Sequence, residues 1–182
     1  GACLVACRWV GGGVVLRRGR CSIVGSSLLY SSANAEGIGS EGYIGFRIEQ
    51  GAKFAWFCTY MPVGVNASPE LITRADQREY MYRQIRSFRE TKPIFTIDFW
   101  NDGDYIGGCV AGGRAYCHIN ANGDVDPCVF IHYSDSNIRE KSLLECLQSP
   151  MFMAYHDNQP FNENMLRPCP MLENPEFIEK MV

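Results

Sequence analysis

The sequence FAWFCTY, residues 54–60, decides the predicted fold of the first half of the chain. It is a continuous run of mostly apolar residues that ends where Met61 and Pro62 begin a loop. Such a run is typical of a strand that is buried on both faces of a parallel sheet. Residues 23–30 and 94–100 are two further apolar segments of similar length. The sequence therefore predicts three strands in this part of the chain.

Two segments with helical spacing separate these predicted strands. Ser40 is suited to cap a helix that runs through residue 50, and Thr73 to begin another helix that runs to about residue 89. The resulting order of strand, helix, strand, helix, strand over residues 23–100 predicts βαβ units and a parallel sheet with right-handed crossovers. A closed barrel needs more strands than these. We therefore expect an α/β fold class with only part of a sheet.

The composition excludes several classes of protein. Hydrophobic residues make up 46% of the 182 residues and charged residues 20%, which excludes general disorder and low-complexity structure. A formal net charge of −3 argues against a nucleic-acid partner, because such a partner usually requires a basic patch. Arg8 interrupts the long apolar segment near the start, so we expect no membrane span.

The cysteine content is the unusual feature of the composition. Nine cysteines are too many for ordinary core packing, and an odd number leaves one thiol over in any intramolecular set of disulfides. The chain begins at Gly1 and lacks the pattern of a signal peptide, so we expect a truncated chain in a reducing, cytoplasmic setting. Clustered cysteines more often bind metal there. Residues 1–22 show no clear period, and we expect them to be a disordered or foreign segment.

The last third of the chain predicts a small hairpin followed by helices. A glycine-rich loop covers residues 107–113, and Asn122 with Gly123 is a strong hairpin signal. We expect short strands on both sides of that turn, and helices over residues 142–148 and 150–156.

Three cysteines of this region are candidate metal ligands. Cys109 lies in the glycine-rich loop, Cys128 follows the hairpin turn, and Cys169 lies between two prolines. A hairpin brings residues that are distant in sequence close together, and three or four thiolates select iron–sulfur clusters or zinc. The spacing alone leaves open that these are three unrelated thiols.

The spacing of Cys109, thirteen residues, Gly123, four residues and Cys128 resembles the auxiliary-cluster motif of SPASM and twitch domains. These domains follow the barrel of many radical S-adenosylmethionine (SAM) enzymes. By this resemblance, residues 23–104 are late βα units of a partial barrel of the TIM type, the C-terminal part of a radical SAM barrel. Residues 105–182 are then a small α+β domain of hairpin and helices that binds an auxiliary cluster.

The resemblance also implies a ligand set and cofactors. Cys109, Cys128 and Cys169 would hold an auxiliary [4Fe–4S] cluster. Full SPASM domains carry a run of further cysteines near their C-terminus, and here only Cys169 remains, so a three-cysteine, twitch-like site is the better match. The alternative is a non-enzymatic zinc-binding module in which the same three thiolates are structural ligands.

The intact family cleaves SAM reductively at a second [4Fe–4S] cluster, and the resulting 5′-deoxyadenosyl radical abstracts a hydrogen from the substrate. The CxxxCxxC motif that holds this cluster is absent, because Val10 stands where Cys3 and Cys7 would require a third cysteine. We therefore expect a radical SAM enzyme as the parent and an inactive chain on its own. The resemblance implies an electron donor such as flavodoxin or ferredoxin, and a peptide, cofactor precursor or small molecule as the substrate.

Polar residues at the predicted strand ends are candidate SAM-binding residues. Functional groups gather at the carboxyl ends of barrel strands, and by the resemblance those loops face SAM and the substrate. The candidates are Ser31, Asn34, Tyr60, Asp98 and Asn101. Turn formation and capping are the alternative roles for such residues. Asp98 stands out because an acid inside an apolar strand is costly to bury.

Overall fold

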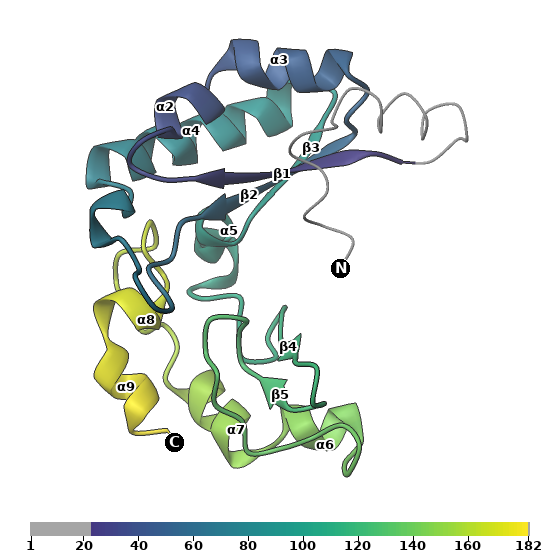
Figure 1. The fold of residues 1–182 in the computed structure, drawn as a ribbon, viewed down its shortest axis with the longest axis vertical. Coiled ribbons are helices and arrows are strands. Elements are labelled where there is room, and N and C mark those ends of the chain that lie inside the picture. The colour runs from purple at the N-terminus through teal and green to yellow at the C-terminus, as the bar shows by residue number, and fades with distance from the viewer. Residues whose placement is uncertain (1–22, 182) are drawn as a thin grey trace. The chain divides into compact units, whose positions relative to one another are not determined.

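The computed structural model of the chain describes residues 23–181, in two compact units with their boundary between Asp98 and Phe99 (Figure 1). We call them the N-terminal unit and the C-terminal unit. The predicted disordered or foreign segment, residues 1–22, lies outside the described residues. No helix among residues 23–181 combines the length and the apolar character needed to cross a membrane.

The N-terminal unit is built on a parallel sheet with the strand order β1-β2-β3. The strands are β1 (Gly25–Tyr30), β2 (Phe54–Thr59) and β3 (Phe95–Asp98), so the three predicted strands are confirmed. β3 ends two residues before the predicted segment 94–100 does, because Phe99 already begins a helix.

Three helices cover one face of this sheet (Figure 1). They are α2 (Ala35–Ile38), α3 (Glu41–Glu49) and α4 (Ala75–Thr91), and the short 3-10 helix η1 (Pro69–Leu71) precedes α4. The helices meet the sheet through a buried core that includes Leu28, Tyr30, Ile44, Phe57, Met81, Ile85 and Phe88.

Local capping sets the starts of α3 and α4. The Ser40 hydroxyl accepts a hydrogen bond from the N–H of Tyr43 at 3.2 Å, so the predicted cap of α3 is confirmed. α4 begins after Arg74 rather than at Thr73. The reason is local, because the Gln77 side-chain oxygen accepts the N–H of Arg74 at 3.2 Å and sets the first turn there.

The second face of the sheet is apolar and partly exposed, and we call it the open sheet face. Leu29, Trp56 and Phe95 lie on it with exposed fractions of 55%, 37% and 65%. The strand β2 alternates, with Ala55 fully buried toward the helices and Trp56 turned to the open side. The prediction that residues 54–60 are buried on both faces is therefore wrong for the described part of the chain.

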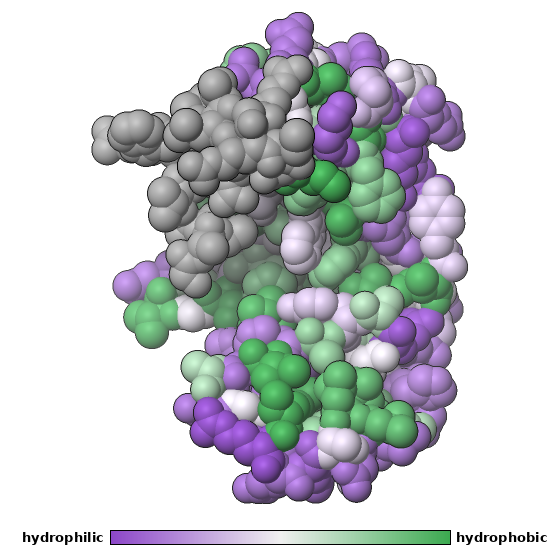
Figure 2. All heavy atoms as spheres, turned by 90° about the vertical axis from the view of Figure 1, so that its right-hand side faces the viewer, coloured by the Kyte–Doolittle hydropathy of each residue, from purple (hydrophilic) through white to green (hydrophobic). Residues whose placement is uncertain are grey.

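The C-terminal unit consists of short elements joined by long loops. Its elements are α5 (Phe99–Ile106), β4 (His118–Ile119), β5 (Val125–Asp126), α6 (Leu143–Leu147), α7 (Pro150–Asp157), α8 (Pro170–Glu173) and α9 (Pro175–Glu179). The predicted hairpin and both predicted helices are confirmed, with shorter strands than expected. Figure 2 shows apolar side chains on the surface of the molecule. The exposed apolar residues of the C-terminal unit include Ile119, Ile138, Leu143 and Leu144.

The hairpin turn depends on one glycine. Gly123 has a φ of +92°, and its N–H donates to the carbonyl of Asn120 at 3.0 Å. A Cβ atom there would lie 2.8 Å from the Asn137 side-chain oxygen. A side chain at this position is therefore strained by the backbone conformation and would also require the Asn137 side chain to shift.

Candidate metal centre

Three cysteines of the C-terminal unit converge from separate segments, and we call them the thiol cluster. Cys109 lies in the loop after α5, Cys128 follows β5, and Cys169 lies directly before α8. All three are partly buried and free. The charge of Cys109 raises the pKa of both Cys128 and Cys169, and the charge of Cys128 raises that of Cys169, so the thiols lie within electrostatic range of one another.

Burial is the largest influence on these thiols. It raises the pKa of Cys109, and it raises the pKa of Cys128 to about 11. Burial also raises the pKa of Cys169 strongly, and the neighbouring Cys109 adds to the effect. Without a cation, the thiol cluster therefore carries its protons at neutral pH. A bound cation would compensate the buried negative charge and release those protons.

Backbone amides oppose the rise in pKa that burial causes at each sulfur. A backbone hydrogen bond lowers the pKa of every cysteine in the thiol cluster, and its donor lies two residues downstream of that cysteine. The donors are Ala111, Phe130 and Met171. Each loop is thus arranged to stabilise a thiolate, which a buried thiol used only for packing does not require.

A tyrosine also contacts the thiol cluster. The Tyr155 hydroxyl donates a hydrogen bond to the Cys109 Sγ at 3.2 Å. Tyr155 lies on α7 and is 1% exposed. Burial raises its pKa, and the charges of Cys109, Cys169 and Cys128 raise it further, so the hydroxyl lies within electrostatic range of all three thiols.

Hydrogen bonds join the loops that carry Cys109 and Cys128. The N–H of Gly112 donates to the carbonyl of Pro127 at 3.0 Å, next to Cys128 in sequence. The Arg114 guanidinium donates to the carbonyl of Cys109 at 3.0 Å, and the N–H of Cys109 donates to the Gln159 side chain at 3.2 Å. The loop backbone is thereby fixed relative to the hairpin.

Three cysteine thiols are a donor set that both zinc and iron–sulfur clusters use. Among residues 23–181, no three His, Cys, Asp or Glu side chains are placed so that they could hold one metal ion. A zinc ion requires all of its thiolates to converge on one point, with Zn–S distances of about 2.3 Å. A four-iron cluster places each thiolate on a different iron, so its ligands need not converge on one point. The donor set of the thiol cluster, three cysteine thiols, fits an iron–sulfur cluster by its chemistry.

The other cysteines of the C-terminal unit belong to a different core. Cys117 and Cys146 pack with Val125 and Phe152. Burial raises the pKa of Cys117, and the nearby Cys146 raises it further. These residues are packing groups in the described structure.

Three of the candidate SAM-binding residues form turns at the ends of β1 and β2. The N–H of Ser31 donates to the Asn34 side-chain oxygen at 2.7 Å, and the Asn34 amide donates to the carbonyl of Leu29 at 3.2 Å. The Tyr60 hydroxyl accepts the N–H of Ser68 at 3.0 Å. The structure thus brings Ser31 and Asn34 together and gives all three residues a role in turn formation.

Asp98 lies in a buried polar network. The Tyr30 hydroxyl donates to the Asp98 carboxylate at 3.0 Å and accepts from the Thr59 hydroxyl at 2.7 Å. The Arg78 guanidinium also donates to the Tyr30 hydroxyl. Asp98 and Arg78 are each 1% exposed. Asn101 is fully buried in α5, within the C-terminal unit.

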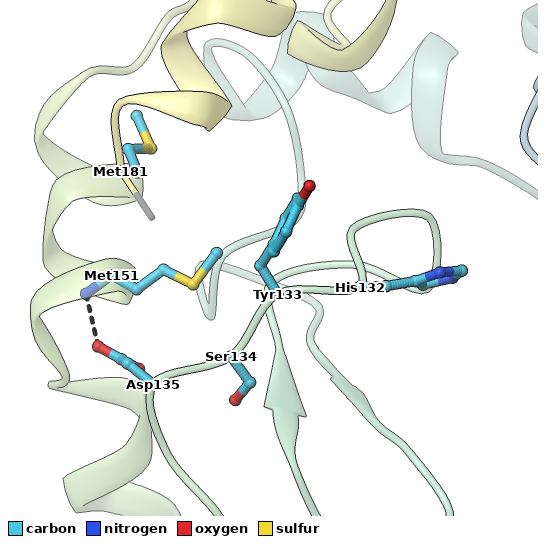
Figure 3. A pocket seen from close by; sticks show the side chains of 6 residues that line it. All are labelled: His132, Tyr133, Ser134, Asp135, Met151 and Met181. Atoms are coloured by element: carbon cyan, nitrogen blue, oxygen red, sulfur yellow. Dashed lines mark hydrogen bonds between the residues drawn. The ribbon is translucent and has the colours of Figure 1, made fainter.

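The C-terminal unit also has a small surface pocket, shown in Figure 3. The residues that line it are His132, Tyr133, Ser134, Asp135, Met151 and Met181. Its volume is about 260 Å³, which is below the usual range of ligand sites. The Asp135 carboxylate accepts the N–H of Met151 at 2.9 Å, and the Ser134 hydroxyl donates to a backbone carbonyl, so these two groups already serve the fold.

Sequence reasoning did not find Tyr155. The hydrogen bond from Tyr155 to Cys109 spans 46 residues, and nothing in the local pattern of α7 distinguishes this tyrosine from a core residue. Position along the helix gives one partial signal, because Tyr155 follows the buried Met151 by one helical turn.

Comparison with known proteins identifies a family for the segment that contains the thiol cluster. Residues 109–171 match the sequence model of a family described as SPASM, an iron–sulfur cluster-binding domain. The matched segment begins at Cys109 and includes Cys128 and Cys169. Neither the curated proteins nor the solved structures contain a match to the chain. The C-terminal unit therefore contains a segment similar to the SPASM iron–sulfur cluster-binding domain.

Proposed function

We propose that the C-terminal unit binds an auxiliary [4Fe–4S] cluster through Cys109, Cys128 and Cys169. The observation that carries this proposal is the convergence of three thiols, each with a backbone amide donor, inside the segment similar to SPASM. Three protein ligands leave one iron available for the substrate, solvent or another ligand.

The chain's own residues would prepare the site before metal arrives. The amides of Ala111, Phe130 and Met171 direct N–H groups toward the sulfurs, which lowers the cost of forming thiolates in a buried position. The buried side chains of Tyr155 and Phe161 belong to the core against which Cys109 and Cys128 pack, and this core would limit the access of water. When bound, the cluster would supply one-electron transfer or a coordination site for the substrate.

We further propose that the parent protein is a radical SAM enzyme, with the N-terminal unit as late βα units of a partial TIM-type barrel. The open sheet face supports this proposal, because parallel sheets are generally covered on both faces. The interior of a barrel would cover Leu29, Trp56 and Phe95. The parent would cleave SAM reductively at a second [4Fe–4S] cluster, in the cytoplasm, with electrons from a flavodoxin or ferredoxin.

In that parent, the strand-end residues would take two kinds of role. Ser31, Asn34 and Tyr60 would shape the loops that face SAM. Asp98 would orient the end of β3 through Tyr30, because its carboxylate is buried. Asn101, which is buried in α5, would remain a candidate SAM-binding residue. The substrate would be a peptide, a cofactor precursor or a small molecule.

Anaerobic reconstitution with iron and sulfide tests the cluster assignment. We expect the purified chain to turn brown and to bind iron and sulfide in equal amounts, about four of each per chain. The variants Cys109→Ala, Cys128→Ala and Cys169→Ala should each lose most of this iron. Cys58→Ala is the matched control, because Cys58 lies in β2 of the N-terminal unit.

Two results would overturn the assignment. Retention of full iron by all three thiol-cluster variants would show that these cysteines are not the ligands. Stoichiometric zinc without sulfide or colour would show that the site is a structural zinc site.

A further inference from the structure

The Tyr155 hydroxyl is a side-chain donor that the structure places on the thiol cluster. Its O–H group donates to the Cys109 Sγ at 3.2 Å. The two residues come from different elements, α7 and the loop after α5. A buried tyrosine hydroxyl usually finds a hydrogen-bond partner, and the partner here is a sulfur of the candidate ligand set.

The ring of Tyr155 has little freedom to move away from Cys109. It packs against Phe161 with the ring centroids 4.8 Å apart in an edge-to-face arrangement. The backbone of Gly112 also lies close to the Tyr155 ring, since a Cβ atom at Gly112 would be 2.1 Å from it. Tyr155 is 1% exposed, so solvent does not compete for its hydroxyl. The contact with Cys109 is therefore held by packing.

We propose that Tyr155 is a positioning residue that raises the reduction potential of the auxiliary cluster by donating a hydrogen bond to the Cys109 sulfur. This inference rests on the proposed function. One-electron reduction makes the cluster and its thiolates more negative, and no bond is formed or broken. A donor directed at a ligand sulfur stabilises the more negative state, and hydrogen bonds to sulfurs are among the factors that set such potentials.

A role in packing alone makes a different prediction. Phenylalanine at position 155 keeps the contacts with Phe161 and Gly112 and removes only the hydroxyl. A packing residue would therefore lose nothing by Tyr155→Phe. A hydrogen-bond donor would change the charge distribution at Cys109 while iron stays bound.

The test is a potentiometric titration of the anaerobically reconstituted chain, followed by electron paramagnetic resonance. We expect Tyr155→Phe to keep the iron and sulfide content and to shift the one-electron equilibrium about tenfold toward the oxidised form. Such a change corresponds to a potential about 59 mV more negative. Tyr133→Phe is the matched control, because Tyr133 belongs to the same unit, is 50% exposed and lines the pocket of Figure 3.

The proposal can still be tested if Tyr155→Phe binds only part of its cluster. The potential is a property of the loaded molecules, so a partly loaded sample still gives it. Replacing Tyr155 with 3-fluorotyrosine makes the hydroxyl a stronger donor, and the potential should then become less negative than in the unmodified chain.

The outcomes separate this inference from the proposed function. An unchanged potential in a loaded Tyr155→Phe variant would refute the role of Tyr155 and leave the cluster assignment intact. Loss of one iron, with the signal of a three-iron cluster, would make Tyr155 a ligand and would also overturn its role as a donor. Failure of the unmodified chain to bind iron would instead refute the proposed function.

Discussion

The close approach of Gly112 to Tyr155 predicts that Gly112→Ala is strongly destabilising. Gly112 has a φ of +70°, in the left-handed region that a residue with a Cβ atom rarely adopts. A Cβ atom built there lies 2.1 Å from Cδ1 and 2.6 Å from Cγ of Tyr155. The added methyl group and the ring cannot both keep their positions. Either the loop that carries Gly112 shifts, or the Tyr155 ring moves away from Cys109.

The expected cost has two parts. The left-handed conformation costs about 1–2 kcal/mol for a residue other than glycine. Forcing a methyl group into a packed site costs about 1–3 kcal/mol more. Gly112→Ala should therefore lower the free energy of unfolding by about 2–5 kcal/mol.

Gly107 provides a matched control in the same unit. Its φ is +66°, and a Cβ atom there meets nothing within 4 Å. Gly107→Ala should therefore show the backbone cost alone, about 1–2 kcal/mol. The difference between the two variants isolates the contact with Tyr155.

Urea denaturation of the metal-free chain, followed by circular dichroism, measures both variants against the unmodified chain. The metal-free form is used so that cluster binding does not add to the measured free energy. Equal losses for Gly112→Ala and Gly107→Ala would refute the argument from close approach. The reduction potential after reconstitution gives a second comparison, because only Gly112→Ala should displace Tyr155 from Cys109.

Two further predictions concern polar groups in each unit. Tyr30→Phe leaves the Asp98 carboxylate and the Thr59 hydroxyl without one buried partner each, and we expect a loss of about 1–3 kcal/mol in the free energy of unfolding; a loss within measurement error would contradict the network. Burial is the largest single influence on Asp135 and raises its pKa, but the hydrogen bonds from Met151, Ser149 and Ser136 together outweigh burial and lower the pKa of Asp135. Its stabilising effect is therefore complete above the ordinary pKa of about 3.9 and is lost as the pH falls through the lowered value in the folded chain. Denaturation at several pH values should show a smaller loss of stability on acidification for Asp135→Asn than for the unmodified chain.

Local sequence accounts for much of the fold. The apolar runs around residues 28 and 57 predict strands, since each run is short and bounded by loop residues. The Ser40 cap lies where the sequence places it, because a cap needs only a hydroxyl and the first turn that follows it. These features depend on neighbours within a few residues, so a single sequence contains the information.

The candidate metal ligands were predictable for a different reason. The spacing of Cys109, Gly123 and Cys128 reflects a hairpin whose turn requires a glycine, and Gly123 indeed has a positive φ. Cys169 was predictable as a candidate because it lies between two prolines in a loop. The direction of the backbone amides at the sulfurs was not predictable, because it depends on the conformation of each loop.

Short-range sequence patterns determined the strands, the helices and the hairpin of this protein, and they indicated the three cysteines as candidate metal ligands. Tertiary structure decided which face of β2 is buried, because that depends on where the helices pack and not on the apolar content of residues 54–59. It also decided that Asp98 is a buried partner of Tyr30, and that Tyr155 reaches Cys109 across 46 residues. Contacts of this kind arise from the packing of separate segments, so they cannot be predicted from local composition and spacing.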